Sequence, residues 1–137
     1  MAERYLVSVG AGSLYIDDGF ALPHAWTGAG VTIEAPFTGA HLLHLSVAGC
    51  VLNDVYREAD KLAVPVDGVR VTAEGSFDTE TWTSTGIAYT VAVDSTASAE
   101  DIERLLAVVD EVAEIPKVLG PGVAVRRAGA WVDEEPR

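Results

Sequence analysis

One unbroken stretch, residues 38–62, constrains the fold of this chain more than any other feature. It contains no Pro, and its apolar residues fall on nearly every side of a helix drawn through it. Thr38 is a suitable N-cap and Pro65 ends the pattern, so we predict a long helix between them. Such a helix needs cover on more faces than a chain of 137 residues with one further helix provides. We therefore expect an intertwined homodimer with an apolar interface of about 2,000 Å² or more.

The segments on either side of this helix read mainly as strands. The patterns predict strands at residues 5–9, 13–16, 31–34, 69–77, 87–93 and 123–127, with a turn at 10–12. The fourth and fifth of these are joined by a polar linker and are expected to form an antiparallel hairpin. A capping box at Ser98 opens a second helix, which Pro116 ends. This order indicates an α+β fold with antiparallel pairing in a single domain, residues 1–137, whose last residues are expected to fray.

The charge and cysteine content exclude several classes of function. The chain has nine Lys and Arg residues and 21 Asp and Glu residues, which gives a formal charge of −12. This charge makes nucleic acid or an anionic membrane surface an unfavourable partner. Cys50 is the only cysteine, so an intramolecular disulfide and a structural zinc site built from several cysteines are excluded. No secretory signal is visible, and the longest apolar stretch, residues 42–52, is too short to span a membrane. We expect a soluble cytoplasmic protein without a cofactor or metal ion.

Three segments carry a resemblance to a known family. They are the helix segment Gly39–Cys50 (GAHLLHLSVAGC), the segment Val66–Val71 (VDGVRV) and the segment Gly86–Val93 (GIAYTVAV), which leads into the helix capped by Ser98. In order and spacing, residues 39–125 resemble the OsmC/Ohr family, the osmotically inducible and organic hydroperoxide resistance proteins. The resemblance implies an OsmC-like fold, with antiparallel sheets packed on a long central helix and a second helix, in an intertwined dimer. It also implies a thiol peroxidase that acts against oxidative stress.

The resemblance implies a peroxidatic Cys on the central helix, a resolving Cys before a Pro, and an Arg and a Glu that hold the first Cys as thiolate. Only a thiolate attacks a peroxide, and a nearby cation lowers the pKa of the thiol. By position, Cys50 matches the peroxidatic Cys. Ile115 stands in place of the resolving Cys and Ala40 in place of the Glu, and the turn at residues 10–12 has no Arg, which leaves Arg4 as the only Arg nearby. Of the family's functional residues, the resemblance therefore assigns only the nucleophile, Cys50, to this chain. It implies that an external thiol completes the reaction.

The residues around Cys50 leave its role open. In an apolar helix a single Cys is either a buried packing residue or a reactive thiol. Asn53, Asp54 and Arg57 share its side of the helix, since they follow it by three, four and seven residues. Arg57 is a candidate for stabilising a thiolate, although an ion pair between Arg57 and Asp54 is the simpler prediction.

Histidine and tryptophan side chains supply further candidates for a pocket near Cys50. His41 and His44 share a helix face but lack a third metal ligand, so we predict a core or interface role, with His44 as the pocket candidate. Trp82 lies in a polar loop and is predicted at a pocket or an interface. The small residues 48–49 leave space beside the cysteine, and we expect a pocket there at the dimer interface. Its expected lining consists of Leu43, His44, Val47 and Trp82.

Three functions of different classes follow. The first is a one-cysteine, thiol-dependent hydroperoxide reductase that acts on hydrophobic peroxides through Cys50. The second is a non-catalytic OsmC-like relative that binds a small hydrophobic molecule at the dimer interface, and a purely structural role is a third. Because the positions of the family's Arg and Glu lack those residues, we expect Cys50 to react slowly with peroxides at neutral pH.

Overall fold

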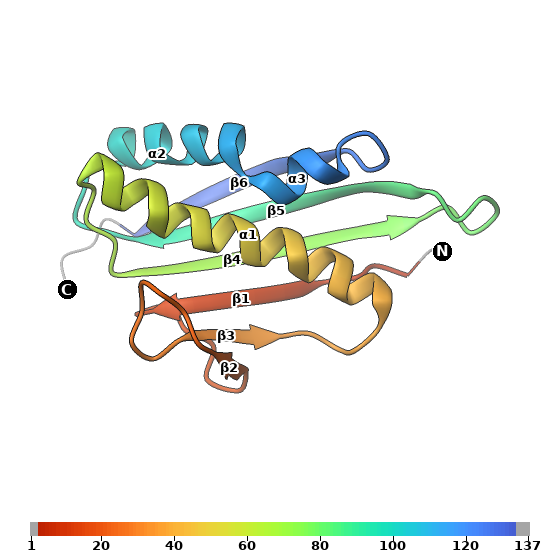
Figure 1. Ribbon diagram of the computed structural model, residues 1–137, viewed down its shortest axis with the longest axis horizontal. Coiled ribbons are helices and arrows are strands. Elements are labelled where there is room, and N and C mark those ends of the chain that lie inside the picture. Colours follow the sequence, from red (N-terminus) through yellow and green to blue (C-terminus); the bar gives the residue numbers. More distant parts are fainter. Residues whose placement is uncertain (1–2, 134–137) are drawn as a thin grey trace.

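The structure of the chain, a computed structural model, describes residues 3–133. Within this range the elements follow in the order β1 (Val7–Gly12), β2 (Phe20–Leu22), β3 (Val31–Glu34), α1 (Gly39–Leu62), β4 (Gly68–Phe77), β5 (Ser84–Asp94), α2 (Ala99–Val112), α3 (Glu114–Leu119) and β6 (Val125–Asp133). One sheet and its helices form the α+β fold that the sequence predicts (Figure 1). The chain end predicted to fray comprises residues 133–137. Asp133 is the last residue of β6, and residues 134–137 lie outside the described range.

The long helix predicted between Thr38 and Pro65 is confirmed as α1. The Thr38 side chain caps its start by accepting a hydrogen bond from the His41 N–H at 3.0 Å. The helix ends at the left-handed residue Ala63, two residues before Pro65. Its buried side packs against β1 and β4 through small and branched side chains: Val47, Ala48, Val51, Leu52 and Val55. The helix therefore crosses the middle of the sheet and carries Cys50 halfway along its length.

The strands form one sheet in the order β2-β3-β1-β4-β5-β6. The predicted antiparallel hairpin consists of β4 and β5, with Val71 opposite Val91. The other described pairs are also antiparallel except β5 and β6, which run parallel, with Val91 opposite Ala130. The expectation of antiparallel pairing throughout is therefore wrong at this edge. The physical reason is the connection, because residues 95–124 cross over the sheet through α2 and α3 before β6 begins.

Two local predictions are also wrong. β1 continues through residues 10–12, where a turn was predicted, and the turn comes at residues 13–14, within the segment predicted as the next strand. Gly12 has a φ of +60°, and a Cβ there would overlap the carbonyl oxygen of Asp67, so only Gly fits. Pro116 does not end the second helix. The break comes at Ala113, which is extended, and Pro116 lies in the first turn of α3, where a Pro costs no helical hydrogen bond.

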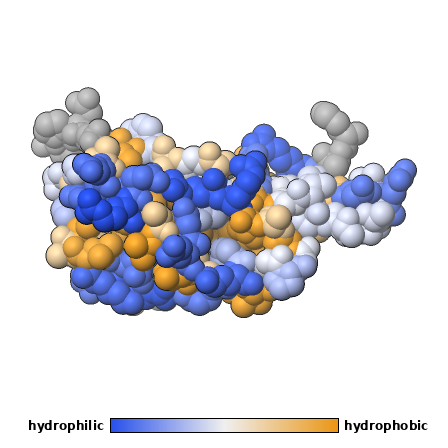
Figure 2. Space-filling model, turned by 90° about the horizontal axis from the view of Figure 1, so that it is seen from above, coloured by the Kyte–Doolittle hydropathy of each residue, from blue (hydrophilic) through white to orange (hydrophobic). Residues whose placement is uncertain are grey.

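All three described helices lie on one face of the sheet (Figure 1). α1 covers β1 and β4, while α2 contacts α1 and β6. Large apolar side chains stay exposed in or next to β2 and the start of α1: Leu22, Trp26, Phe37 and Leu42. Seen from above, hydrophilic and hydrophobic side chains are intermixed on the surface (Figure 2). No helix within residues 3–133 has an apolar stretch of the length that a membrane span requires.

Candidate functional site

The thiol of Cys50 is half-buried between α1 and α3. Its Sγ donates a hydrogen bond to Oδ2 of Asp54, one helical turn further along α1, at 3.8 Å. The start of α3 approaches the sulfur as well, and the backbone N–H groups of Ile115 and Glu114 interact with it. The sulfur is thus placed between a carboxylate and two backbone donors.

A single guanidinium group holds the carboxylates next to Cys50. Arg57 lies 3.3 Å from Asp54, 3.0 Å from Glu58 and 3.1 Å from Glu114. The Asp54 side chain is completely buried, whereas that of Glu114 is 59% exposed. The ion pair predicted between Arg57 and Asp54 is therefore confirmed, and the donors of Arg57 are engaged by carboxylates.

The environment of Cys50 opposes ionisation of its thiol. Burial raises the pKa of Cys50, and the negative charges of Asp54 and Glu114 raise it further. The backbone N–H groups of Ile115 and Glu114 act in the opposite sense, but the net pKa lies above the usual value. Burial also raises the pKa of Asp54, against the lowering effects of Asn53 and Arg57. Cys50 is therefore mainly a thiol at neutral pH, with a small thiolate fraction.

The position that the resemblance gives to a resolving Cys does lie beside Cys50. It is occupied by Ile115, so the site offers no second sulfur for an intramolecular disulfide. Glu114, the preceding residue, is brought to the same place by α3. Sequence reasoning missed Glu114, although its position next to Ile115 was the clue available.

His44 is a core residue and does not share the Cys50 side of α1. It precedes Cys50 by six residues, which turns it by about 120° around the helix, and it is completely buried. Its ring stacks on Tyr5 and meets Phe77 edge-on. His41 joins the same cluster, with its ring edge-on to Tyr5. Both histidines therefore have the core role that was one of the two alternatives predicted for them.

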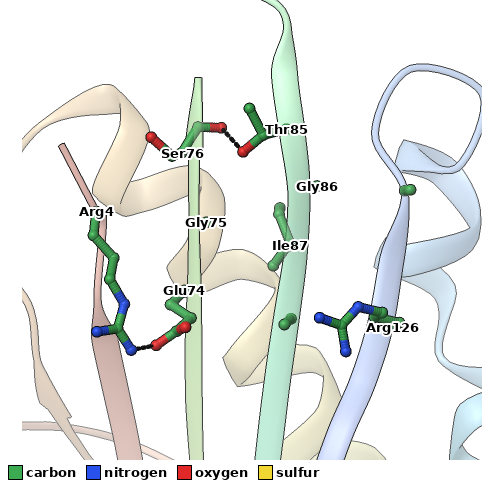
Figure 3. A pocket seen from close by; sticks show the side chains of 10 residues that line it. Arg4, Glu74, Gly75, Ser76, Thr85, Gly86, Ile87 and Arg126 are labelled. Carbon is green, nitrogen blue, oxygen red and sulfur yellow. Dashed lines mark hydrogen bonds and ion pairs between the residues drawn. The ribbon is translucent and has the colours of Figure 1, made fainter. Parts of the chain in front are cut away.

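Arg4 and Trp82 lie on other parts of the molecule. Arg4 forms an ion pair with Glu74 on the face of the sheet that the helices leave open (Figure 3). There it lines a hollow of about 310 Å³ together with Arg126. Trp82 lies in the linker between β4 and β5 and is 67% exposed. Of the residues that the sequence singled out around Cys50, Arg57 contacts the carboxylates next to the thiol, whereas Arg4, His44 and Trp82 lie elsewhere.

An apolar cavity of about 370 Å³ opens between α1 and the β1–β3–β2 part of the sheet. Its helix side is lined by Leu42, Leu45, Ser46, Gly49, Leu52 and Asn53. Its other side is lined by Val9, Leu22, Pro23, His24, Val31 and Ile33. Gly49 directly precedes Cys50 in the sequence, but successive residues point about 100° apart around a helix. The Cys50 sulfur lies next to α3, and Cys50 is not among the residues that line the cavity. The residues that line it include none of the four predicted ones, Leu43, His44, Val47 and Trp82.

Comparison with known proteins places this arrangement in a family. Residues 34–126 match the family of OsmC-like proteins. A hypothetical protein from Aquifex aeolicus VF5 has a similar structure, with a TM-score of 0.64 and 16% identity over 99% of this chain and 98% of that chain. An OsmC-like protein from Mycoplasma pneumoniae gives a TM-score of 0.64 and 13% identity over 86% of this chain and 100% of that chain.

A third solved structure carries a functional name. It is an organic hydroperoxide resistance protein OsmC from Legionella pneumophila, also called a predicted redox protein and regulator of sulfide bond formation. It gives a TM-score of 0.57 and 17% identity over 72% of each chain. No curated protein sequence matches the chain. At these identities the solved structures establish the fold, whereas the family match covers most of the chain and includes Cys50. The chain therefore belongs to the family of OsmC-like proteins.

Proposed function

We propose that this protein is a thiol-dependent hydroperoxide reductase with a single reacting cysteine, Cys50. The observation that supports this best is the placement of the Cys50 sulfur between the Asp54 carboxylate and the backbone N–H groups at the start of α3. The N–H groups stabilise negative charge on the sulfur, and the carboxylate accepts the hydrogen bond of the thiol. The relative from Legionella pneumophila, an organic hydroperoxide resistance protein, supports the same chemistry.

In the proposed reaction the Cys50 thiol loses its proton to the solvent, and the thiolate attacks the outer oxygen of a hydroperoxide, ROOH. An S–O bond forms as the O–O bond breaks, and the alkoxide takes up a proton and leaves as the alcohol ROH. Cys50 is then a sulfenic acid, oxidised by two electrons. Because Ile115 occupies the position of a second cysteine, an external thiol condenses with the sulfenic acid and releases water. A second external thiol then reduces the mixed disulfide and restores Cys50.

The substrate class is proposed from the apolar cavity between α1 and the sheet. Its lining is mostly aliphatic, and part of it is supplied by α1, the helix that also carries Cys50. A hydroperoxide with an apolar R group gains from burial in such a cavity, whereas an anionic one is repelled by a chain with a net charge of −12. We therefore propose small hydrophobic hydroperoxides, such as cumene hydroperoxide, as substrates.

The raised pKa of Cys50 sets the pH dependence of the proposed reaction. Below that pKa the thiolate fraction falls about tenfold for each pH unit, and the rate falls with it. The reaction is therefore slow at neutral pH and faster at alkaline pH. The same observation favours the second function, in which a non-catalytic relative binds a small hydrophobic molecule in the cavity.

We also propose a homodimer that forms through the surface at the start of α1 and next to β2. The exposed apolar side chains at the start of α1 and next to β2 include Phe37, which is 86% exposed, and Leu22 and Leu42, which border the cavity. A second copy on this side would cover these side chains and close the cavity. The reaction also needs a supply of reduced thiols, which supports a cytoplasmic location.

The test is consumption of cumene hydroperoxide in the presence of dithiothreitol by the wild-type protein and by Cys50→Ser. We expect wild-type turnover that yields one cumyl alcohol per peroxide and rises with pH, and background consumption by Cys50→Ser. Circular dichroism and light scattering are expected to show the same fold and a dimer for both proteins. Equal consumption by both would contradict the proposed reaction. If the peroxide stays intact while cumyl alcohol binds to the protein, the non-catalytic binding function replaces the proposed reductase function.

A further inference from the structure

We infer that Cys50, Asp54 and Glu114 form a binding site for a divalent cation of the Zn²⁺ type. Each side chain offers one ligand atom, and the three atoms lie within 4.8 Å of one another. A thiolate and two carboxylates are ligands that Zn²⁺ accepts, with an open position left for water. The inference goes beyond the proposed function, because binding of the cation does not depend on peroxide chemistry at Cys50.

The spacing of the ligand atoms is close to that of a tetrahedral site. Zn–S and Zn–O bonds of about 2.3 and 2.0 Å place a sulfur and an oxygen ~3.5 Å apart. The Sγ of Cys50 and Oδ2 of Asp54 are 3.8 Å apart, and α1 fixes this distance because the residues are one helical turn from each other. Glu114 has to approach by about 1 Å to complete the set. Its side chain is 59% exposed and can change rotamer without disturbing the core.

The ion pairs of the cluster leave one oxygen of each carboxylate for the cation. Arg57 contacts Oδ1 of Asp54 and Oε1 of Glu114, and Asn53 also donates to Oδ1 of Asp54. Within the described residues, Oδ2 of the completely buried Asp54 side chain accepts only the weak S–H donor of Cys50. A buried carboxylate oxygen without an N–H or O–H donor is costly, and a cation would satisfy it. Arg57 would remain as an outer partner that orients both carboxylates.

The charge of the cluster also favours a divalent cation. The three carboxylates that contact Arg57, together with a Cys50 thiolate, carry four negative charges. Two basic side chains contact these carboxylates: Arg57, and Lys61, whose Nζ lies 3.3 Å from Glu58. A cation of charge +2 therefore brings the cluster to neutrality. The sequence did not predict this site because Glu114 comes from a different helix.

The test is a titration of the reduced full-length protein, first freed of metal by a chelator, with Co²⁺ and then Zn²⁺. We expect one Co²⁺ per chain, a thiolate-to-Co²⁺ charge-transfer absorption, and displacement of the Co²⁺ by Zn²⁺. Saturation with Zn²⁺ should slow alkylation of Cys50 by iodoacetamide about tenfold or more, since a coordinated thiolate is no longer free to react.

Two variants and a matched control complete the test. Cys50→Ser should remove the charge-transfer absorption, and Glu114→Gln should weaken Zn²⁺ binding about tenfold or more. Glu111→Gln makes the same change at an exposed position of α2 and should bind Zn²⁺ like the wild type. Absence of the absorption, or equal affinities of Glu114→Gln and Glu111→Gln, would overturn the inference. The peroxide assay is run with chelator present and therefore does not depend on a bound cation. Failure of the cation site and failure of the proposed peroxide reduction can thus be told apart.

Discussion

Replacing Asp54 with Asn should lower the pKa of the Cys50 thiol. The Asp54 carboxylate oxygen lies 3.8 Å from the sulfur, and a unit charge at about 4 Å contributes ~1 kcal/mol in water and ~4 kcal/mol near a protein surface. Because Cys50 is only half-buried, we expect about 1.4 kcal/mol, near the lower end of that range. This corresponds to one pKa unit and to about ten times more thiolate at pH 7. Asn has nearly the shape of Asp, so the packing around this buried position is kept.

The assay for this prediction is the pH dependence of alkylation by iodoacetamide, measured with chelator present. The rate follows the thiolate fraction, so its midpoint reports the pKa of Cys50. Asp60→Asn is the matched control, because it removes the same charge from an exposed position of α1, ten residues or ~15 Å beyond Cys50. We expect the control to share the wild-type midpoint and Asp54→Asn to titrate about one unit lower. An unchanged or higher midpoint for Asp54→Asn would refute the electrostatic account of the site.

Four further substitutions test individual contacts and backbone positions of the structure. Gly49→Ala should raise the free energy of unfolding in urea by about 0.5–1 kcal/mol, since a Cβ there meets no atom and Ala favours the helix, and a loss would mean that the position is crowded. Gly75→Ala should lower the melting temperature, because its Cβ would lie 2.5 Å from Nε2 of His44, and unchanged melting would argue against that contact. Thr38→Ala should cost about 1 kcal/mol of stability in urea through loss of the N-cap, and a neutral result would exclude a capping role. Trp82→Gly should leave the alkylation rate of Cys50 unchanged and relieve a φ of +59°, whereas a changed rate would return Trp82 to the site.

The main elements of the fold were predictable because their patterns are local. The N-cap Thr38 and the apolar periodicity after it define α1, and strict alternation defines the hairpin of β4 and β5. The direction of β6 was not predictable in this way, because the residues of a strand do not encode whether its neighbour runs parallel. Pro116 was misread for a related reason. A Pro is acceptable in the first turn of a helix as well as after its end, and only the extended Ala113 decides between the two.

The candidate site was predictable where its residues share one helix. Cys50 was identified from the resemblance, and Asp54 and Arg57 follow from helical spacing alone. Glu114 lies 64 residues beyond Cys50 in the sequence, so only the packing of α3 on α1 reveals it. His44 was singled out by its residue type, which gives no information about burial. Its direction, about 120° around α1 from Cys50, decides against a place beside the thiol.

The most direct test of the central claim is a single turnover of the reduced protein with cumene hydroperoxide, without external thiol and with chelator present. The alcohol formed per chain and the mass of the Cys50 peptide are measured at several pH values from neutral to alkaline. The proposal predicts one alcohol per chain, an added oxygen on Cys50, and a rate that rises about tenfold per pH unit until the thiol pKa is reached. A rate that does not change with pH, or peroxide that survives while Cys50 stays unmodified, would contradict it.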